Sequence, residues 1–190
     1  MTPAVFLDRD GTLIEEARDL DRLDLLAFFP WTVDAVRLLN RAGFAVVVTT
    51  NQSAVGRGLI DEAFLATVHA RIDAQLEAGG ARIDRYYFCP HHPTAPIERY
   101  RRVCRCRKPA PGMIEDATRD LGLDLARSFT VGDRWRDIQA GQAAGVRAVL
   151  VKTGYGAADA LQPPADARAD AILNNLMEAV GWILRAATSR

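Results

Sequence analysis

The feature that most constrains this fold is the alternation of short apolar runs with longer amphipathic stretches. The apolar runs predict strands over residues 4–7, 44–49, 86–88, 129–131, 146–151 and, last, 171–173. The amphipathic stretches predict helices over residues 31–41, 61–77, 111–121, 133–144 and 176–187. Strands that alternate with helices of this length indicate a parallel sheet covered on both faces. We therefore expect a three-layer, doubly wound α/β fold with a mostly parallel sheet.

The ends and faces of these helices can also be predicted. Asp61 is a suitable N-terminal cap, and Gly145 closes the helix before the strand at 146–151. Residues 154–167 have the composition of a loop and are too few to join two domains. We expect one domain over residues 1–190, without a large cap domain. In the helix over 31–41, the candidate inward residues are Val33, Val36, Leu38 and Leu39.

Composition narrows the classes of protein. The chain has 24 basic and 24 acidic side chains, and this balance argues against general nucleic-acid binding. The first residues run directly into a predicted buried strand, without the pattern of a signal peptide. No apolar run approaches the roughly 18 residues that a membrane span needs. We expect a cytoplasmic protein, without nucleic-acid or membrane partners, that can work as a monomer.

Polar side chains follow the predicted strands directly, where sites lie in parallel sheets. Asp8 and Asp10 come after the first strand, within Phe6-Leu7-Asp8-Arg9-Asp10-Gly11-Thr12. Two such carboxylates can converge on Mg²⁺, which prefers oxygen ligands. One of them can attack phosphorus while the other transfers a proton. The alternative is an ordinary Asp-Gly turn.

Three further segments have functional and structural interpretations. Thr49-Thr50-Asn51-Gln52-Ser53 could hold phosphate oxygens, or could be a polar loop with a helix cap. Arg107-Lys108-Pro109 offers charges for a phosphoryl group, or is a solvated basic run. Asp133 could complete a metal site, and Asp137 would share a helix face with it. The alternative is that Asp133 and Asp137 only stabilise the N-terminus of a helix through its dipole.

All three cysteines lie in one short segment. Cys89, Cys104 and Cys106 occur with His91 and His92 in a C-x-H then C-x-C arrangement. Three thiolates and one imidazole complete a tetrahedral Zn²⁺ shell, which is typical of a structural site. Either histidine could be the fourth ligand. The alternative is three buried free thiols.

In order and spacing, these four segments together resemble the haloacid dehalogenase-like (HAD-like) phosphotransferases, over residues 5–151. The resemblance implies a HAD-like Rossmann-type fold in which Asp8 is the nucleophile and Asp10 the general acid and base. It further implies that Thr50 and Lys108 bind the phosphoryl group. Mg²⁺ would be bound by Asp8, the backbone carbonyl of Asp10, and Asp133.

The segment over residues 89–108 resembles the zinc loop of the D-glycero-D-manno-heptose 1,7-bisphosphate 7-phosphatases, which act in making a lipopolysaccharide precursor. The resemblance selects His91, two residues after Cys89, as the fourth Zn²⁺ ligand. It implies a phosphatase for a small phosphorylated metabolite, most simply the 7-phosphate of the heptose bisphosphate. The substrate contacts that it implies are Asn51, Gln52, Ser53, Arg107 and Arg134.

The chain departs from that family in one segment. Family members usually carry an Asp-His-Gly-Tyr-like stretch after the first motif, and residues 15–24 contain none. This region resembles the related histidinol-phosphate phosphatases, which supply the alternative substrate. The basic run before Lys108 suggests either a wall facing a second phosphate or a zinc-stabilised nucleic-acid contact. A nucleic-acid module leaves Asp8, Asp10 and Asp133 unexplained, and an inactive relative is not supported because all the expected reactive residues are present.

Overall fold

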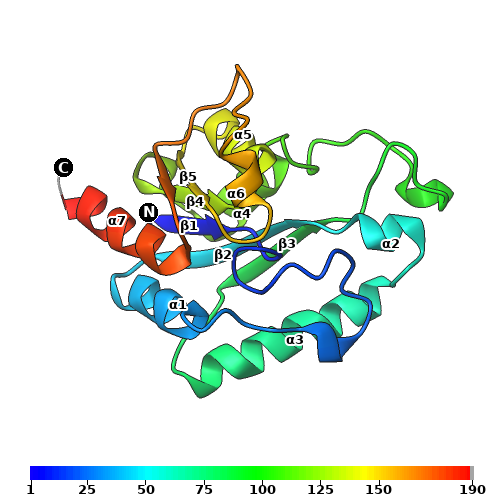
Figure 1. The fold of residues 1–190 in the computed structure, drawn as a ribbon, viewed down its shortest axis with the longest axis horizontal. Helices are drawn as coiled ribbons and strands as arrows, with labels where there is room; N and C mark the ends of the chain where they lie inside the picture. The colour runs from blue at the N-terminus through cyan, green and yellow to red at the C-terminus, as the bar shows by residue number, and fades with distance from the viewer. Residues whose placement is uncertain (189–190) are drawn as a thin grey trace.

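The computed structural model of the protein, described over residues 1–188, contains a six-stranded sheet in the order β3-β2-β1-β4-β5-β6 (Figure 1). Every neighbouring pair of strands is parallel. This confirms the predicted doubly wound α/β fold. The strands are β1 (Ala4–Leu7), β2 (Ala45–Asn51), β3 (Arg85–Cys89), β4 (Phe129–Gly132), β5 (Arg147–Val151) and β6 (Ala171–Leu173).

Helices cover both faces of the sheet, as Figure 1 shows. One layer holds α1 (Thr32–Arg41), α3 (Glu62–Ala78) and α7 (Leu176–Thr188), and the other holds α4 (Gly112–Leu121) and α5 (Trp135–Ala143). Two shorter helices, α2 (Ser53–Arg57) and α6 (Gly156–Asp159), follow β2 and β5. Single 3-10 turns lie at Leu23–Leu25, Glu98–Tyr100 and Leu125–Arg127. None of the helices among residues 1–188 has the length and apolar character that a membrane span requires.

The central strands are buried because both of their faces pack on helices. Val46, Val47 and Val48 of β2 have no exposed surface. Such continuous β-branched runs are typical of strands covered on both sides. Covering the sheet leaves the loops at the carboxyl ends of the strands as the place where polar groups can gather.

Several local predictions are confirmed and two are wrong. Asp61 caps α3, since its Oδ1 accepts a 2.7 Å hydrogen bond from the Phe64 amide. Leu38 is 39% exposed, because the buried stripe of α1 passes through Ala35, Val36 and Leu39 instead. The predicted loop over residues 154–167 contains the short helix α6. Helix α2 was not predicted, since five residues are too few to show a helical period.

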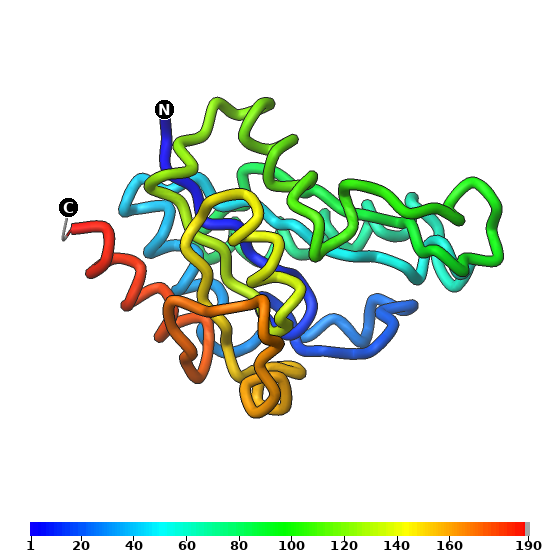
Figure 2. Tube along the Cα trace, turned by 90° about the horizontal axis from the view of Figure 1, so that it is seen from above, coloured from blue at the N-terminus to red at the C-terminus, as the bar shows by residue number. Residues whose placement is uncertain are grey.

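The segment over residues 90–108 extends beyond the sheet as a long loop beside α2 (Figures 1 and 2). Its contact with α2 is close, because a Cβ on Gly56 would lie 2.6 Å from the Pro90 carbonyl oxygen. The amide of Ile97 donates a hydrogen bond to the Gly56 carbonyl. The loop therefore approaches the carboxyl end of β2 before the chain enters α4.

Candidate active site

Asp8 and Lys108 form the centre of the site. Asp8 follows β1 directly, and its Oδ1 accepts a 2.8 Å hydrogen bond from Lys108 Nζ. The same Nζ donates to the Thr49 carbonyl at 2.8 Å and lies 2.5 Å from Asp137 Oδ1. Asp8 and Lys108 are each 5% exposed. The fold thus brings together Asp8 of the first predicted motif and Lys108 of the third, which are 100 residues apart in the sequence.

Three carboxylates converge here, and we call Asp8, Asp133 and Asp137 the carboxylate cluster. One oxygen of each lies within 4.8 Å of the others. Asp133 and Asp137 do not share a helix face as predicted, because α5 begins only at Trp135. Instead Asp137 Oδ2 accepts from the Arg134 amide at 3.0 Å and closes the first turn of the helix.

Glycines hold the Asp133 carboxylate in place. Its Oδ2 accepts a 2.8 Å hydrogen bond from the Tyr155 amide. A Cβ on Gly11 or on Gly154 would lie 2.3 or 2.2 Å from the same oxygen. Both glycines have positive φ angles, which other residues rarely adopt. Two separate turns therefore close on this carboxylate at van der Waals distance.

The electrostatics of the carboxylate cluster favour a cation. Burial, followed by the charges of Asp8 and Asp137, raises the pKa of Asp133 to about 8. Burial also raises the pKa of Asp137. Although burial opposes it, the attraction of Asp137 and Asp8 raises the pKa of Lys108. Lys108 and the nearby Arg136 offset the charge of the three carboxylates only in part, and carboxylate oxygens are the hard ligands that Mg²⁺ prefers.

Asp10 lies beside the carboxylate cluster but is held by other groups. Arg9, which is 1% exposed, donates to both carboxylate oxygens of Asp10 at 2.9 Å. Gln52 Nε2 donates to Asp10 Oδ2 and to Thr50 Oγ1, both at 2.8 Å. This network fixes the Asp10 carboxylate at the rim of the site.

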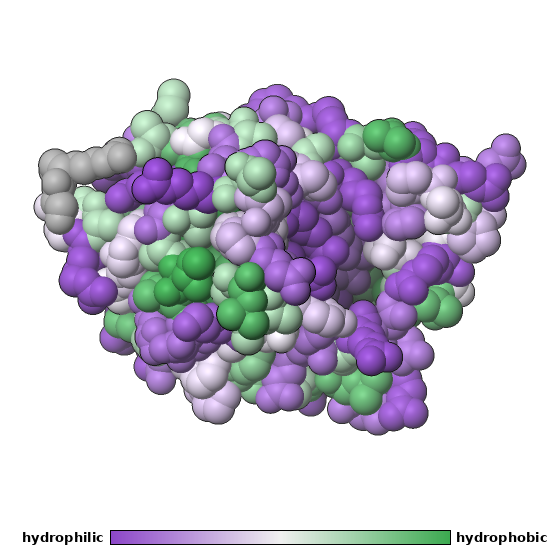
Figure 3. Space-filling view, turned by 45° about the horizontal axis from the view of Figure 1, so that its top comes forward, coloured by the Kyte–Doolittle hydropathy of each residue, from purple (hydrophilic) through white to green (hydrophobic). Residues whose placement is uncertain are grey.

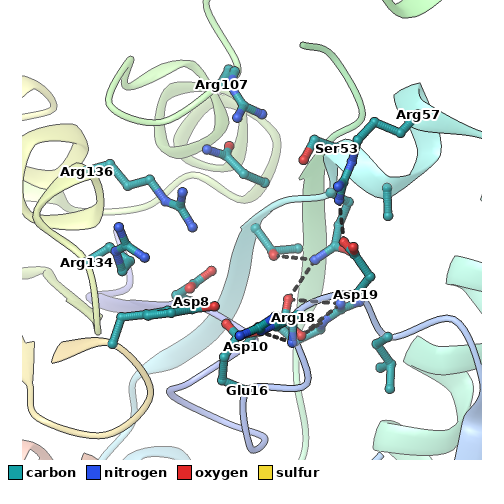
Figure 4. A pocket seen from close by; sticks show the side chains of 17 residues that line it. Asp8, Asp10, Glu16, Arg18, Asp19, Ser53, Arg57, Arg107, Arg134 and Arg136 are labelled. Atoms are coloured by element: carbon teal, nitrogen blue, oxygen red, sulfur yellow. Dashed lines mark hydrogen bonds and ion pairs between the residues drawn. The ribbon is translucent and has the colours of Figure 1, made fainter. Parts of the chain in front are cut away.

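A polar pocket of about 210 Å³ opens next to Asp8. Figure 3 shows a hollow with mostly hydrophilic walls on one face of the molecule, and Figure 4 shows the side chains that line the pocket. Asp8, Asp10, Thr50 and all five predicted substrate contacts belong to its lining. Those five residues are Asn51, Gln52, Ser53, Arg107 and Arg134.

Some of these residues are also bound to the protein itself. The side-chain amide of Asn51 exchanges two 3.0 Å hydrogen bonds with the backbone of Lys108. Arg107 Nη1 donates to the His91 carbonyl at 2.9 Å. Asn51 therefore attaches the long loop to β2, and this attachment places Lys108 against Asp8.

The second group of ligands is the thiol cluster, formed by Cys89, His91, Cys104 and Cys106. Its sulfur–sulfur distances are 3.2, 3.3 and 3.5 Å, and His91 Nδ1 lies 3.4 Å from Cys106 Sγ. These distances are too long for disulfide bonds, and all three cysteines are free. A tetrahedron with bonds of about 2.3 Å has edges of roughly 3.8 Å, so a small outward shift of the sulfur atoms would accommodate Zn²⁺.

The thiol cluster distinguishes the two histidines. His92 Nδ1 accepts from the Thr94 amide and lies 3.0 Å from the Thr94 hydroxyl. It is His91 that faces the sulfur atoms. The neighbouring Cys89 thiol lowers the pKa of Cys106 to about 5, which favours the thiolate that a metal requires.

The basic run of the long loop does not form a continuous wall. Arg105 forms ion pairs with Glu115 and Asp116 of α4. Arg101 donates hydrogen bonds to the carbonyls of residues 95 and 96. Arg107 is the arginine of this run that lines the pocket. The prediction that the run as a whole faces a second phosphate is therefore wrong.

Comparison with known proteins gives the family. Residues 105–179 match the HAD-hydrolase-like family. The D-glycero-beta-D-manno-heptose-1,7-bisphosphate 7-phosphatase of Escherichia coli (strain K12) is 42% identical over 177 residues, which are 93% of this chain and 91% of that protein. The chain belongs to this family of HAD-like phosphatases. The enzyme of the same name from Photorhabdus laumondii is 39% identical over the same share of this chain.

Solved structures agree with this assignment of the phosphatase. The D,D-heptose 1,7-bisphosphate phosphatase from B. bronchiseptica, complexed with magnesium and phosphate, is 34% identical with a TM-score of 0.85. The match covers 97% of this chain and 99% of that one. A putative HAD-like phosphatase from Mesorhizobium loti is 31% identical with a TM-score of 0.84, over 99% and 87% of the two chains.

Sequence reasoning missed several residues of the pocket. Those not predicted are Arg9, Glu16, Arg18, Asp19, Leu20, Ala54, Arg57, Arg136 and Tyr155. Residues 15–24 lacked the expected motif and so gave no individual prediction, yet this segment forms one wall. Arg136 lies within the motif that contains Asp133 and Asp137. Its position two residues after the predicted substrate contact Arg134 could have indicated that it lines the same pocket.

Proposed function

We propose that this phosphatase removes the 7-phosphate of D-glycero-D-manno-heptose 1,7-bisphosphate through a phosphorylated Asp8. The observation that carries the chemistry is the buried pair of Asp8 and Lys108 within the carboxylate cluster, with Asp8 lining a pocket in which arginines outnumber acidic residues. The substrate rests on the relatives, which bear that name and match nearly the whole chain.

The residues divide the reaction into two steps. An Asp8 oxygen attacks phosphorus, the ester P–O bond breaks, and Asp10 gives its proton to the leaving sugar oxygen. Asp10 then takes a proton from water, whose oxygen attacks phosphorus, so that inorganic phosphate leaves and the Asp8 carboxylate is restored. Lys108 offsets the repulsion between a carboxylate and a phosphate dianion.

The two metals have different proposed roles. Mg²⁺ bound by Asp8, the Asp10 carbonyl and Asp133 would stabilise negative charge on the phosphoryl oxygens. Zn²⁺ bound by the thiol cluster would fix the loop over residues 89–108. Thr50 and Lys108 would bind the phosphoryl group, while Asn51, Gln52, Ser53, Arg107 and Arg134 would line the path of the substrate. A monomeric state and a cytoplasmic location stay predictions, as does a single domain.

The test is phosphate release by the purified protein with Mg²⁺. Both anomers of the heptose bisphosphate would be compared with histidinol phosphate and with common sugar phosphates. We expect the highest kcat/KM with a heptose bisphosphate, at the 7-position. A preference for histidinol phosphate would contradict the substrate but not the phosphatase chemistry, and would direct attention to residues 15–24.

A further inference from the structure

The arginines around the pocket differ in what holds them. Arg134 Nε donates to Asp159 Oδ2 at 3.1 Å, and its guanidinium lies over the Tyr155 ring. Arg57 is ion-paired with Asp19. Arg107 is bound to the His91 carbonyl and Arg9 to Asp10, as described above. Each of these four cations therefore has an acceptor or a ring within the protein, although Arg9 Nη1 is buried without a partner.

Arg136 is different. It is half-buried in the first turn of α5 and lines the pocket. Its Nε is inaccessible to solvent and has no hydrogen-bond partner among residues 1–188. Its two Nη groups also have no hydrogen-bond partner among these residues, and unlike Nε they are not shut off from an acceptor in the pocket. A guanidinium without any such bond is unfavourable.

The nearby carboxylates do not supply that acceptor. Asp8 and Asp137 both pair with Lys108, and Asp133 accepts from the Tyr155 amide. No ion pair joins any of them to Arg136 within the described residues. Figure 4 shows the guanidinium directed into the pocket, on the side where Asp8 lies.

The shape of the guanidinium indicates the missing acceptor. Its N–H groups form a planar fork that matches two oxygens of a phosphate, and such charge-assisted pairs are strong. We infer that Arg136 binds a phosphate group of the substrate directly and is a binding residue of this active site. The identity of that substrate rests on the proposed function, but the need of Arg136 for an anion does not.

A different role would be electrostatic only. Arg136 lies close enough to Asp137, Asp8 and Asp133 to feel their charges. If it served merely to balance the carboxylate cluster, its loss would leave more negative charge for a cation. Mg²⁺ would then activate at lower concentration, while phosphate would bind as before.

The experiment compares Arg136→Gln and Arg136→Lys with Arg41→Gln, an exposed control at the end of α1, where the chain turns toward the start of β2. Inorganic phosphate is the probe, and its affinity is measured by calorimetry at saturating Mg²⁺. Kinetics use p-nitrophenyl phosphate, which has one phosphate, and heptose 1,7-bisphosphate, which has two.

We expect Arg136→Gln to weaken phosphate binding or bisphosphate kcat/KM by about 10- to 100-fold, with the Lys variant intermediate and the control unchanged. A loss with both substrates and with inorganic phosphate assigns Arg136 to the transferred phosphate. A loss with the bisphosphate alone assigns it to the second phosphate. If the wild-type protein does not act on the bisphosphate, the proposed function fails while the phosphate and p-nitrophenyl phosphate measurements still test Arg136.

The inference is overturned if Arg136→Gln binds phosphate and turns over both substrates like the control. It is equally overturned if only the Mg²⁺ concentration for half activation falls. Thermal unfolding of each variant, with and without phosphate, separates these results from misfolding. The Lys variant keeps the charge and serves if the Gln variant does not fold.

Discussion

The carboxylate cluster is fully buried and the thiol cluster is partly so, and the chain builds these two candidate metal sites in different ways. Asp8 and Asp133 directly follow β1 and β4, which are neighbours in the sheet, so secondary structure places them. In the thiol cluster, Cys89 ends β3, whereas Cys104 and Cys106 lie in a long loop. The sheet can form the first cluster without a metal, whereas Cys104 and Cys106 of the second lie outside regular secondary structure, in a loop held by contacts such as those of Asn51 with Lys108.

This difference in construction corresponds to a difference in expected role: the carboxylate cluster takes part in the reaction, and the thiol cluster supports the loop. The carboxylate cluster reaches a polar pocket through Asp8, and the raised pKa of Asp133 and of Asp137 shows that the neighbouring cations do not offset all of its negative charge. The thiol cluster would supply four ligands to Zn²⁺ and leave no position for a substrate. Loss of metal from the first should stop the reaction with the fold intact, whereas loss from the second should release Lys108, two residues after Cys106.

The largest expected effect is on the reaction itself. Asp8→Asn removes the attacking oxygen charge while keeping the shape of the side chain. We expect kcat to fall by about 10⁴-fold or more, with a melting temperature near that of the wild-type protein. Phosphate release is the measurement, and the exposed Asp24→Asn is the control. Activity within tenfold of wild type would show that the carboxylate cluster is not the reactive site.

The next effect concerns stability. Cys104→Ser should lose the bound zinc and lower the free energy of unfolding on the order of 4 kcal/mol, because the loop loses its cross-link. Metal analysis and urea unfolding measure the two quantities. His92→Ala should retain zinc, since His92 faces Thr94 instead of the sulfur atoms. Equal zinc content in wild type and Cys104→Ser would refute the assignment of the thiol cluster.

A pH effect distinguishes the carboxylate cluster further. Burial beside Asp8 and Asp137 raises the pKa of Asp133 to about 8, whereas an unfolded aspartate titrates near 4. Between these values the folded chain binds more protons than the unfolded one. The contribution of Asp133 to the stability of the Mg²⁺-free protein should therefore fall as pH rises from about 4 to about 8. Burial lowers the pKa of His69 to about 3, and this opposes the fall below about pH 6.5.

Urea unfolding at several pH values measures that slope. The buffer contains neither Mg²⁺ nor a chelator. Asp133→Asn should flatten it, because the amide does not titrate. Added Mg²⁺ should stabilise the wild-type protein more at pH 8 than at pH 6. A slope that is unchanged in Asp133→Asn would mean that another group carries the proton.

The smallest expected effect lies in the wall formed by residues 15–24. Asp19 pairs with Arg57 of α2. The Asp19 side chain is 34% exposed and the Arg57 side chain 44%. Arg57→Gln should lower stability by less than about 1 kcal/mol. We expect KM to change by less than about threefold. A tenfold rise in KM for one substrate only would instead identify this wall as a determinant of specificity.

Sequence reasoning recovered the strands and the residues at their carboxyl ends, because burial on both faces leaves a continuous apolar pattern. It also found the thiol ligands, since their clustering in one segment is visible without a fold. It could not find the pairing of Lys108 with Asp137, which depends on where a long loop docks. Nor could it separate Arg136 from Arg134, because their difference lies in partners such as Asp159 that are distant in the sequence.

The contact of Gly11 and Gly154 with the Asp133 carboxylate has a consequence for which substitutions the chain can accept. A Cβ on Gly154 would also lie 2.7 Å from the Gly11 Cα, so neither position has room for even one methyl group. If both positions are randomised to all amino acids and active variants are selected, nearly all of them should carry glycine at residues 11 and 154. Gly154 lies in a turn after β5, where substitutions are usually tolerated, yet it should vary as little as a residue that takes part in the reaction.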